Sequence, residues 1–251
     1  MTKRNPKQEG SNVWDCKPQS GPCPVGCNQC FYNRPGAFYV PTDEPHMPEL
    51  SEVGDGIMRV NSGHDSNIQR EKVIADTARY PKRFFNTSIP NLDFPAPVVL
   101  TANPQEEDWT AYHLPQAMPN VRGVIVPDNL MFVRLRASAS NLRPVTRAAW
   151  EWAREGVPVV ITFMAYYDVE PPIPKAFAGV ECYVWKTRHV NSYWCPTRGF
   201  MREYMRRFGK AAGTRGRLVT MCGTPGSAYC TNCRNCETYY YQTIKRMEGV
   251  T

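Results

Sequence analysis

Three cysteines near the start of the chain have the spacing of a metal site. Cys23, Cys27 and Cys30 follow the pattern C-x3-C-x2-C, which places three thiols in one short loop. Thiols this close together are poorly placed for mutual disulfides and well placed to converge on one metal centre. On a four-iron cluster they would leave one iron without a protein ligand, where chemistry can take place. The alternative is a structural zinc loop whose fourth ligand comes from Cys16, from His46 or from farther away.

This motif resembles the signature of the radical S-adenosylmethionine superfamily, in which an aromatic residue usually precedes the last cysteine. Here Gln29 takes that place, and Phe31 and Tyr32 follow the cysteine. The resemblance implies that the three cysteines hold a 4Fe-4S cluster whose open iron binds the amino and carboxylate groups of S-adenosylmethionine. One electron would then cleave this cofactor to methionine and a 5′-deoxyadenosyl radical, which abstracts hydrogen from a substrate. It also implies a reductant such as flavodoxin or ferredoxin as a partner.

A second group of four cysteines lies close together near the C-terminus: Cys222, Cys230, Cys233 and Cys236. The run C-x2-C-x2-C is more usual for iron–sulfur binding than for zinc knuckles. We therefore expect an auxiliary 4Fe-4S cluster, as several branches of the resembling superfamily carry; a four-cysteine zinc site is the alternative. The aromatic residues in 237–242 either stack on nucleic-acid bases or pack back onto the fold.

Length and composition favour one catalytic domain. The chain has 251 residues and 42% hydrophobic content, enough for one sizeable core. We expect a mobile leader over 1–11, a barrel over 12–221 and a cysteine-rich extension over 222–251. No run approaches the roughly 18 apolar residues that span a bilayer, and no secretory signal is evident. A cytoplasmic protein without membrane contact follows. In a reducing compartment, clustered cysteines are interpreted as metal ligands, and seven of the ten cysteines fall into two tight clusters.

The clearest topology signal is a strand–helix–strand unit in the middle of the chain. A strand is expected over 130–136, a helix over 142–155 that stops at Gly156, and a near-continuous apolar strand over 157–164. This order predicts that the two strands pair in parallel, because a helix connects them. The remaining predictions are strands over 12–15, 56–61, 83–87, 97–103, 179–186 and 217–221, and helices over 68–79 and 197–210. Together they predict an α/β fold, a partial TIM-like (β/α) barrel with parallel strands.

Four residues follow the strand predicted over 56–61: Ser62, Gly63, His64 and Asp65. Small residues let the backbone approach a ligand, and a carboxylate accepts hydrogen bonds from an ammonium group. The resemblance implies that this segment binds the amino group of the cofactor. A turn leading to a helix cap at Ser66 or Asn67 is the alternative.

A basic residue and a serine end the strand predicted over 130–136. The resemblance implies that Arg136 and Ser138 contact the carboxylate and ribose of the cofactor. Alternation along the strand points Arg134 to the same side as Arg136. That side is either the barrel interior, where two arginines need anions, or solvent.

Positive charge gathers late in the chain. The formal net charge is +7, and residues 186–217 hold nine Lys or Arg against one acid, Glu203. Such a field could steer an anionic substrate or a nucleic acid, and a solvated helix face is the plainer explanation. A second hypothesis is therefore a non-catalytic, zinc-stabilised nucleic-acid-binding protein.

Overall fold

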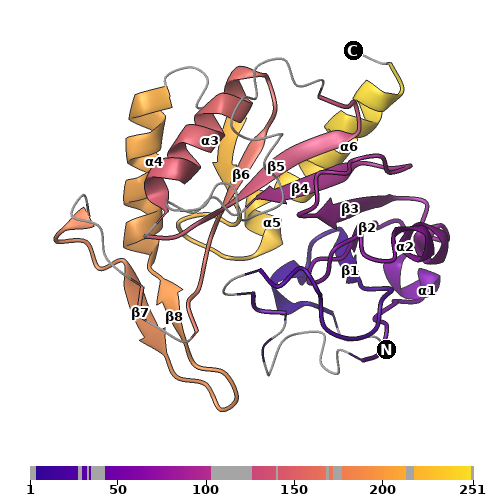
Figure 1. Ribbon diagram of the computed structural model, residues 1–251, viewed down its shortest axis with the longest axis horizontal. Coiled ribbons are helices and arrows are strands. Elements are labelled where there is room, and N and C mark those ends of the chain that lie inside the picture. Colours follow the sequence, from indigo (N-terminus) through magenta and orange to yellow (C-terminus); the bar gives the residue numbers. More distant parts are fainter. Residues whose placement is uncertain are drawn as a thin grey trace. The chain divides into compact units, whose positions relative to one another are not determined.

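A computed structural model describes residues 4–27, 30–32, 34, 43–102, 126–139, 141–167, 170–171, 177–212 and 218–249 of the chain (Figure 1). They form two compact units. The described residues before 102, those in 126–132 and those from 229 onward make up unit 1, and those in 133–228 make up unit 2. The predicted domain boundaries, after residues 11 and 221, stay a prediction.

Unit 1 is built on parallel strands that follow one another along the chain. Its strands are β1 (Val13–Cys16), β2 (Ile57–Val60), β3 (Arg83–Thr87), most of β4 (Val98–Ala102) and the start of β5 (Leu130–Ala137). Its helices are η1 (Pro6–Gln8), α1 (Leu50–Val53), α2 (Arg70–Thr77), α5 (Cys230–Cys233) and α6 (Asn235–Met247). The segments predicted over 83–87 and 97–103 are both strands, and the first of them pairs with β2.

Unit 2 contains the predicted strand–helix–strand unit. Its elements are the rest of β5, α3 (Leu142–Arg154), β6 (Val159–Phe163), β7 (Tyr183–Lys186), β8 (Tyr193–Pro196), α4 (Arg198–Ala212) and β9 (Val219–Met221). Strands β5 and β6 are parallel, as the strand–helix–strand order predicts, and β9 continues beside β6. Helix α3 ends before Gly156, whose φ of 79° is readily adopted only without a side chain.

The hydrogen-bonded strand order is β1-β2-β3-β4-β5-β6-β9, and β7 and β8 form a separate antiparallel pair. A seven-stranded parallel sheet with connecting helices confirms the predicted α/β class. Strands β1 to β6 lie in the sheet in the same order as in the sequence. The β7–β8 hairpin was not predicted, because only its first strand has an apolar pattern. No helix in the described ranges has the length and apolar character needed to cross a membrane.

The core of unit 1 lies between the sheet and α2. Cys16, Val60, Val73, Phe85 and Val98 are all buried there. The rings of Phe85 and Phe94 stack with their centroids 4.6 Å apart. Cys16 is thus a core residue of β1, and burial raises the pKa of its thiol well above the usual value.

Helix α6 covers another part of the same sheet. Tyr240 is buried, and its ring centroid lies 6.5 Å from that of Phe84; the ring of Tyr239 lies 5.5 Å from that of Phe132. Near the end of the helix, Arg246 donates hydrogen bonds to the carbonyl oxygens of Asp128 (2.8 Å) and Leu130 (2.5 Å). Of the two alternatives for the aromatic tail, these contacts support packing onto the fold.

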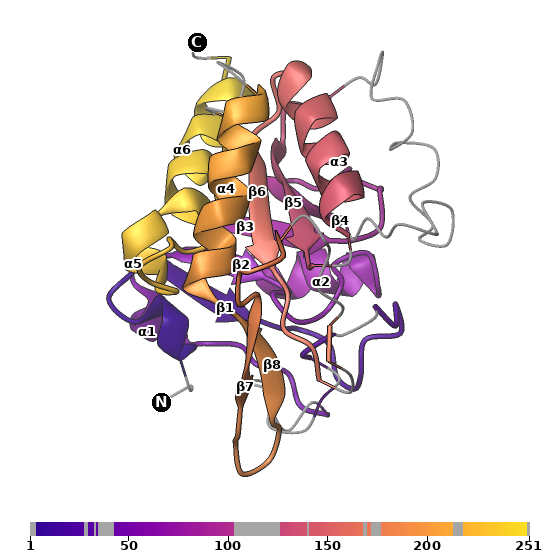
Figure 2. The same ribbon diagram turned by 90° about the vertical axis from the view of Figure 1, so that its left-hand side faces the viewer.

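Helices α3 and α4 of unit 2 lie side by side (Figure 2), and the core of this unit uses their apolar faces. Ala148, Ala149 and Trp152 of α3 are buried, in agreement with their helical spacing. On α4 the buried residues include Phe200 and Tyr204, whose ring centroids lie 5.4 and 5.5 Å from that of Phe163 in β6. The predicted amphipathic face of α4 is therefore its packing face.

The segment before β1 has defined contacts in unit 1. Asp15 is buried and forms an ion pair with Arg59, its register partner on β2, at 2.5 Å. Gln8 is fully buried and donates to Asp15 Oδ1 (2.8 Å), and Asn5 donates to Oδ2 (3.1 Å). Residues 4–11, for which the sequence predicts a mobile leader, are thus tied to β1 and β2 by polar contacts with one carboxylate.

This carboxylate should make stability depend on pH. Burial alone would raise the pKa of Asp15, but the charge and hydrogen bonds of Arg59, with those of Asn5 and Gln8, outweigh it and hold the pKa below its usual value. The resulting stability is present above the pKa of an unfolded Asp, about 3.9, and is lost as the pH falls through the lower folded pKa.

We therefore expect Asp15→Asn to lower the free energy of unfolding at pH 7 by about 3 kcal/mol, because Arg59 loses its buried partner. The difference from wild type should shrink below about pH 4. Urea unfolding of wild type and variant, at pH 7 and below about pH 4, measures this difference in the free energy of unfolding. Asp93→Asn is the control, since Asp93 is 96% exposed and pairs with Arg70 at 3.4 Å. A difference that does not change with pH would contradict the ion-pair account.

Candidate metal centre

The three N-terminal cysteines lie in the loop that follows β1. All three are partly buried, and none of the chain's ten cysteines, all of which the structure describes, forms a disulfide. The amide of Cys30 donates to the carbonyl of Cys27 at 3.2 Å, and Gly26 between the first two has a φ of 64°. The loop thus begins at the C-terminal end of a parallel strand, where such folds place their sites.

The thiols influence one another electrostatically. Burial, with smaller contributions from the negative charges of Asp65, Cys30 and Cys27, outweighs a hydrogen bond from the Val25 backbone and raises the pKa of Cys23 to about 11. Without a cation, Cys23 therefore holds its proton at neutral pH. In the described part of the chain, no three Cys, His, Asp or Glu side chains stand close enough to hold a metal ion.

Tyr32 anchors the end of this loop. Its side chain is fully buried, and its hydroxyl donates to the carbonyl of Gly21 at 2.9 Å. Its ring meets that of His64 edge-on, with 5.7 Å between centroids. Burial, and the charges of Cys23 and Cys30, raise the pKa of Tyr32 above its usual range. Tyr32 thereby connects the cysteine loop to the end of β2.

Lys17 and Gln19 support the loop from within, and sequence reasoning did not identify either. Both are fully buried. Lys17 Nζ donates to the carbonyls of Gln19 (2.7 Å) and Glu44 (2.6 Å), and burial lowers its pKa. Gln19 Nε2 donates to the carbonyls of Asp65 (3.0 Å) and Ile68 (2.8 Å). No local pattern marks these residues, because their partners lie up to 49 positions away.

Asp65 joins the ends of β2 and β3. Its carboxylate accepts four hydrogen bonds: from the Asn67 amide (2.9 Å), the Thr87 hydroxyl (2.8 Å), the Ser88 amide (2.6 Å) and the Ser88 hydroxyl (2.7 Å). The Asp65 amide donates to His64 Nδ1 at 2.9 Å, and burial lowers the pKa of His64. His64 is therefore neutral at pH 7. The predicted contact of Asp65 with a cofactor amino group stays a prediction.

The neighbouring residues include acceptors that the fold leaves unsatisfied. Ser62 and Gly63 are partly buried just beyond β2. Asn61, at the start of this turn, has a φ of 60° and donates through Nδ2 to the Ser66 hydroxyl. Asn61 Oδ1 and Gln19 Oε1 are buried and have no hydrogen-bond partner among the described residues. Buried acceptors of this kind cost stability until a donor reaches them.

By residue type, though not by their distances in this structure, the donors are those of an iron–sulfur cluster and an amino ligand. Thiolates are the protein ligands of such clusters, and three of them in one loop match a cluster with one open iron. The unsatisfied oxygens of Asn61 and Gln19 lie at the ends of β2 and β1, in the same unit as the cysteines. An ammonium group supplies the donors that they lack.

Arg136 and Ser138 lie in unit 2, at and just beyond the end of β5. Asn141 closes this turn: its Oδ1 accepts from the Ser138 amide (2.7 Å) and hydroxyl (3.1 Å), and its Nδ2 donates to the Arg136 carbonyl (3.0 Å). Arg134 and Arg136 are partly buried while Leu135 and Ala137 are fully buried, as expected for alternation along a strand. Contact of Arg136 and Ser138 with a cofactor stays a prediction.

The C-terminal cysteines fall in both units. Cys222 is exposed after β9 in unit 2, whereas Cys230 and Cys233 bound α5, and Cys236 lies in the first turn of α6, in unit 1. Gly223 has a φ of 76°, and a Cβ there would lie 2.7 Å from the Ser227 carbonyl oxygen, so the turn after Cys222 requires glycine. The predicted auxiliary cluster stays a prediction.

Comparisons of the chain with protein-family models, with curated proteins and with solved structures give no match. Any assignment of function therefore rests on the residues of the site.

Proposed function

We propose that this chain is a radical S-adenosylmethionine enzyme on a TIM-like partial barrel. The observation that carries the proposal is the position of Cys23, Cys27 and Cys30. They share one loop after the C-terminal end of β1 in a parallel sheet. The negative charges of the other two cysteines, and of Asp65 after β2, contribute to the raised pKa of Cys23. Parallel α/β folds bind their ligands at this edge.

On this proposal the three thiolates hold a 4Fe-4S cluster, which when bound supplies the electron for reductive cleavage of S-adenosylmethionine. The protein's own part is to bind, orient and enclose. The ring contact of Tyr32 with His64 and the hydrogen bond of Gln19 to the Asp65 carbonyl hold the loop beside the end of β2. Asn61 Oδ1 offers a buried acceptor to the cofactor amino group. The other residues proposed to contact the cofactor are Ser62, Gly63, His64, Asp65, Arg136 and Ser138.

The proposal includes an auxiliary 4Fe-4S cluster held by the C-terminal cysteines, and a reductant of the flavodoxin or ferredoxin type. The second candidate function, a zinc-stabilised nucleic-acid-binding protein, is favoured by the exposed arginines of α4, among them Arg198 and Arg202. The two candidates differ in the metal they require. Soft thiolate ligands accept both iron–sulfur clusters and zinc, so residue types alone do not separate them.

Metal analysis of anaerobically prepared protein separates the two. We expect iron and acid-labile sulfide for two four-iron clusters, and for one cluster in a variant with Cys23, Cys27 and Cys30 all changed to Ala, because each group of thiols holds its own cluster. A variant with Cys182 and Cys195 changed to Ala is the control and should keep both clusters. Zinc without sulfide in all three proteins would disprove the radical mechanism.

A further inference from the structure

The β7–β8 hairpin presents an exposed tip. In its register Trp185 lies opposite Trp194 and Lys186 lies opposite Tyr193. Every residue of 185–190 is exposed. Figures 1 and 2 show the hairpin extending away from α4, beyond the end of that helix. Beside the hairpin, Tyr166 pairs with Trp194 through two backbone hydrogen bonds, one from each amide to the other's carbonyl, of 3.0 and 2.7 Å.

Aromatic rings occupy both faces of this hairpin. On one face the rings of Trp185 and Trp194 pack edge to face, 5.3 Å apart, and Trp185 remains 44% exposed. On the other face Tyr193 lies 5.7 Å from Tyr167, and the guanidinium of Arg188 stands 5.1 Å above the Tyr193 ring. Trp185 is the exposed ring of this set, whereas Tyr193 and Trp194 are partly buried and would present only ring edges to a partner.

The same segment is strongly positive. Between Glu181 and Glu203 the sequence has no acidic residue and four basic ones: Lys186, Arg188, Arg198 and Arg202. All four are exposed. Hydrogen bonds from Arg206 and Arg207 lower the pKa of Glu203 to about 2, so this acid is ionised and already engaged by two cations. The acids that bound this stretch, Glu181 and Glu203, line one hollow with Arg202, and none lies between them in the sequence.

We propose that the hairpin surface, defined as Trp185, Lys186, Arg188, Tyr193, Trp194, Arg198 and Arg202, binds single-stranded nucleic acid. Exposed aromatic rings stack on unpaired bases, and the interleaved Lys and Arg neutralise phosphates. A duplex buries the faces of its bases and would use the charges alone. An anionic membrane suits the charge, but Arg188 and His189 at the tip oppose insertion of the tryptophans into the apolar layer.

This inference does not depend on the proposed radical chemistry, and it deepens the second candidate function by naming the surface and the kind of nucleic acid. Binding of a single strand needs neither the cysteine loop nor a cofactor. It gives the aromatic, basic hairpin a role, and it names a single-stranded nucleic acid as the macromolecule to test. The test therefore measures binding alone, so its result is independent of catalysis.

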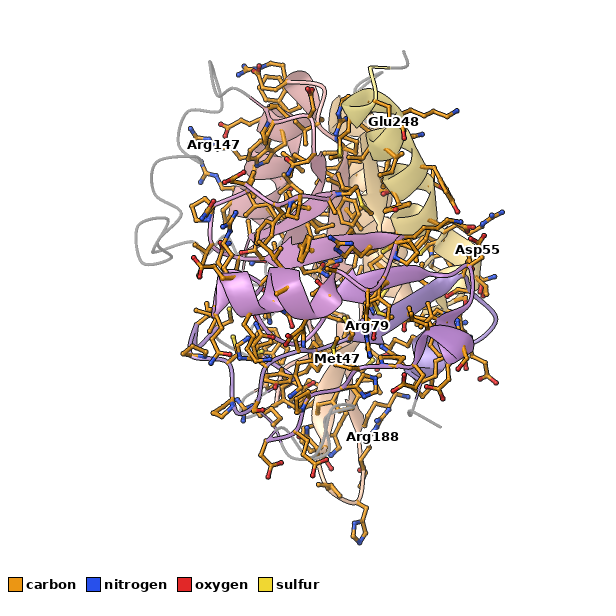
Figure 3. All side chains as sticks on the ribbon, turned by 90° about the vertical axis from the view of Figure 1, so that its right-hand side faces the viewer. Met47, Asp55, Arg79, Arg147, Arg188 and Glu248 are labelled. Atoms are coloured by element: carbon orange, nitrogen blue, oxygen red, sulfur yellow. The ribbon has the colours of Figure 1, made fainter. Side chains whose placement is uncertain are left out.

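The experiment compares two matched variants of the full chain. Trp185→Ser with Arg188→Ser removes one exposed tryptophan and one cation from the hairpin surface. Trp150→Ser with Arg147→Ser removes the same residue types from α3, where Trp150 is 40% exposed and the Arg147 side chain 70% exposed. Figure 3 shows Arg188 and Arg147 at opposite ends of the view, and both lie in unit 2. Circular dichroism checks that both variants fold.

Fluorescence anisotropy with a labelled oligothymidine of about 20 nucleotides, longer than one typical single-strand site, reports the dissociation constant. We expect salt-dependent binding that is weaker by about tenfold or more in the hairpin variant and unchanged in the α3 variant. The triple cysteine variant should bind like wild type. Equal losses in both matched variants, absence of binding at about 50 mM salt, or preference for anionic vesicles over the oligonucleotide would each overturn the proposal.

Discussion

Replacing Cys30 by Ser is expected to lower the rate of reductive S-adenosylmethionine cleavage by more than about a thousandfold. Cys30 is one of only three protein ligands proposed for the catalytic cluster, and a hydroxyl is a poor substitute for a soft thiolate. An enzyme that loses the group performing its chemistry loses much of a rate enhancement of at least about 10⁶. The measurement is 5′-deoxyadenosine formed under anaerobic conditions with dithionite as reductant.

Cys195→Ser provides the matched control. Cys195 is also partly buried and forms no disulfide, but it lies in β8 of unit 2. We expect its variant to cleave the cofactor at the wild-type rate. Cleavage by the Cys30 variant within a few-fold of wild type would show that the loop does not hold the catalytic cluster. Loss of iron from the first site should accompany loss of cleavage.

Replacing Asp65 by Ala is expected to lower the free energy of unfolding by about 2–4 kcal/mol. The substitution leaves two partly buried amides, those of Asn67 and Ser88, without their acceptor, and each unpaired donor costs roughly 1–3 kcal/mol when water does not replace it. The hydroxyls of Thr87 and Ser88 lose the same acceptor. Urea unfolding of the wild type and the variant, both without metal, measures the difference.

Asp55→Ala is the control for this prediction, because Asp55 is 88% exposed and pairs with Lys82 at 2.5 Å (Figure 3). Exposed pairs contribute little, so a change within about 0.5 kcal/mol is expected. A stable Asp65 variant that has lost only cofactor binding would assign this carboxylate to the ligand and contradict its structural role. A variant that loses both stability and cofactor binding would be consistent with a site whose shape depends on Asp65.

Local periodicity made most of the fold predictable. The apolar run of β6, the spacing of Ala148, Ala149 and Trp152 in α3, and the arginine-backed apolar face of α4 are each visible within one element, and the structure confirms all three. The β7–β8 hairpin escaped prediction because β8 has no alternating apolar pattern. Helix α6 was not predicted, because a run of tyrosines is equally typical of a nucleic-acid-binding segment. Only the folded structure shows that Tyr240 and Tyr239 pack on Phe84 and Phe132.

The candidate site likewise has a part that the sequence predicts and a part that only the folded structure shows. Cys23, Cys27 and Cys30 are neighbours in sequence, so their spacing alone suggests a shared centre. The surroundings of these thiols depend on residues far apart in the chain: Lys17 reaches Glu44, and Gln19 reaches Ile68. A buried lysine also opposes the usual preference of its residue type, so no propensity rule would place it there.

The amino-acid sequence by itself determined the α/β class, the order of most strands and helices, and the grouping of seven cysteines into two clusters. These features follow from residue types and spacing within a few turns or strands. Only the tertiary structure decided that Asp65 ties β2 to β3, that Asp15 pairs with Arg59, and that Trp185 faces Trp194 on an exposed hairpin. Hydrogen bonds and ring contacts act over a few ångströms, and only folding brings such distant residues within that range.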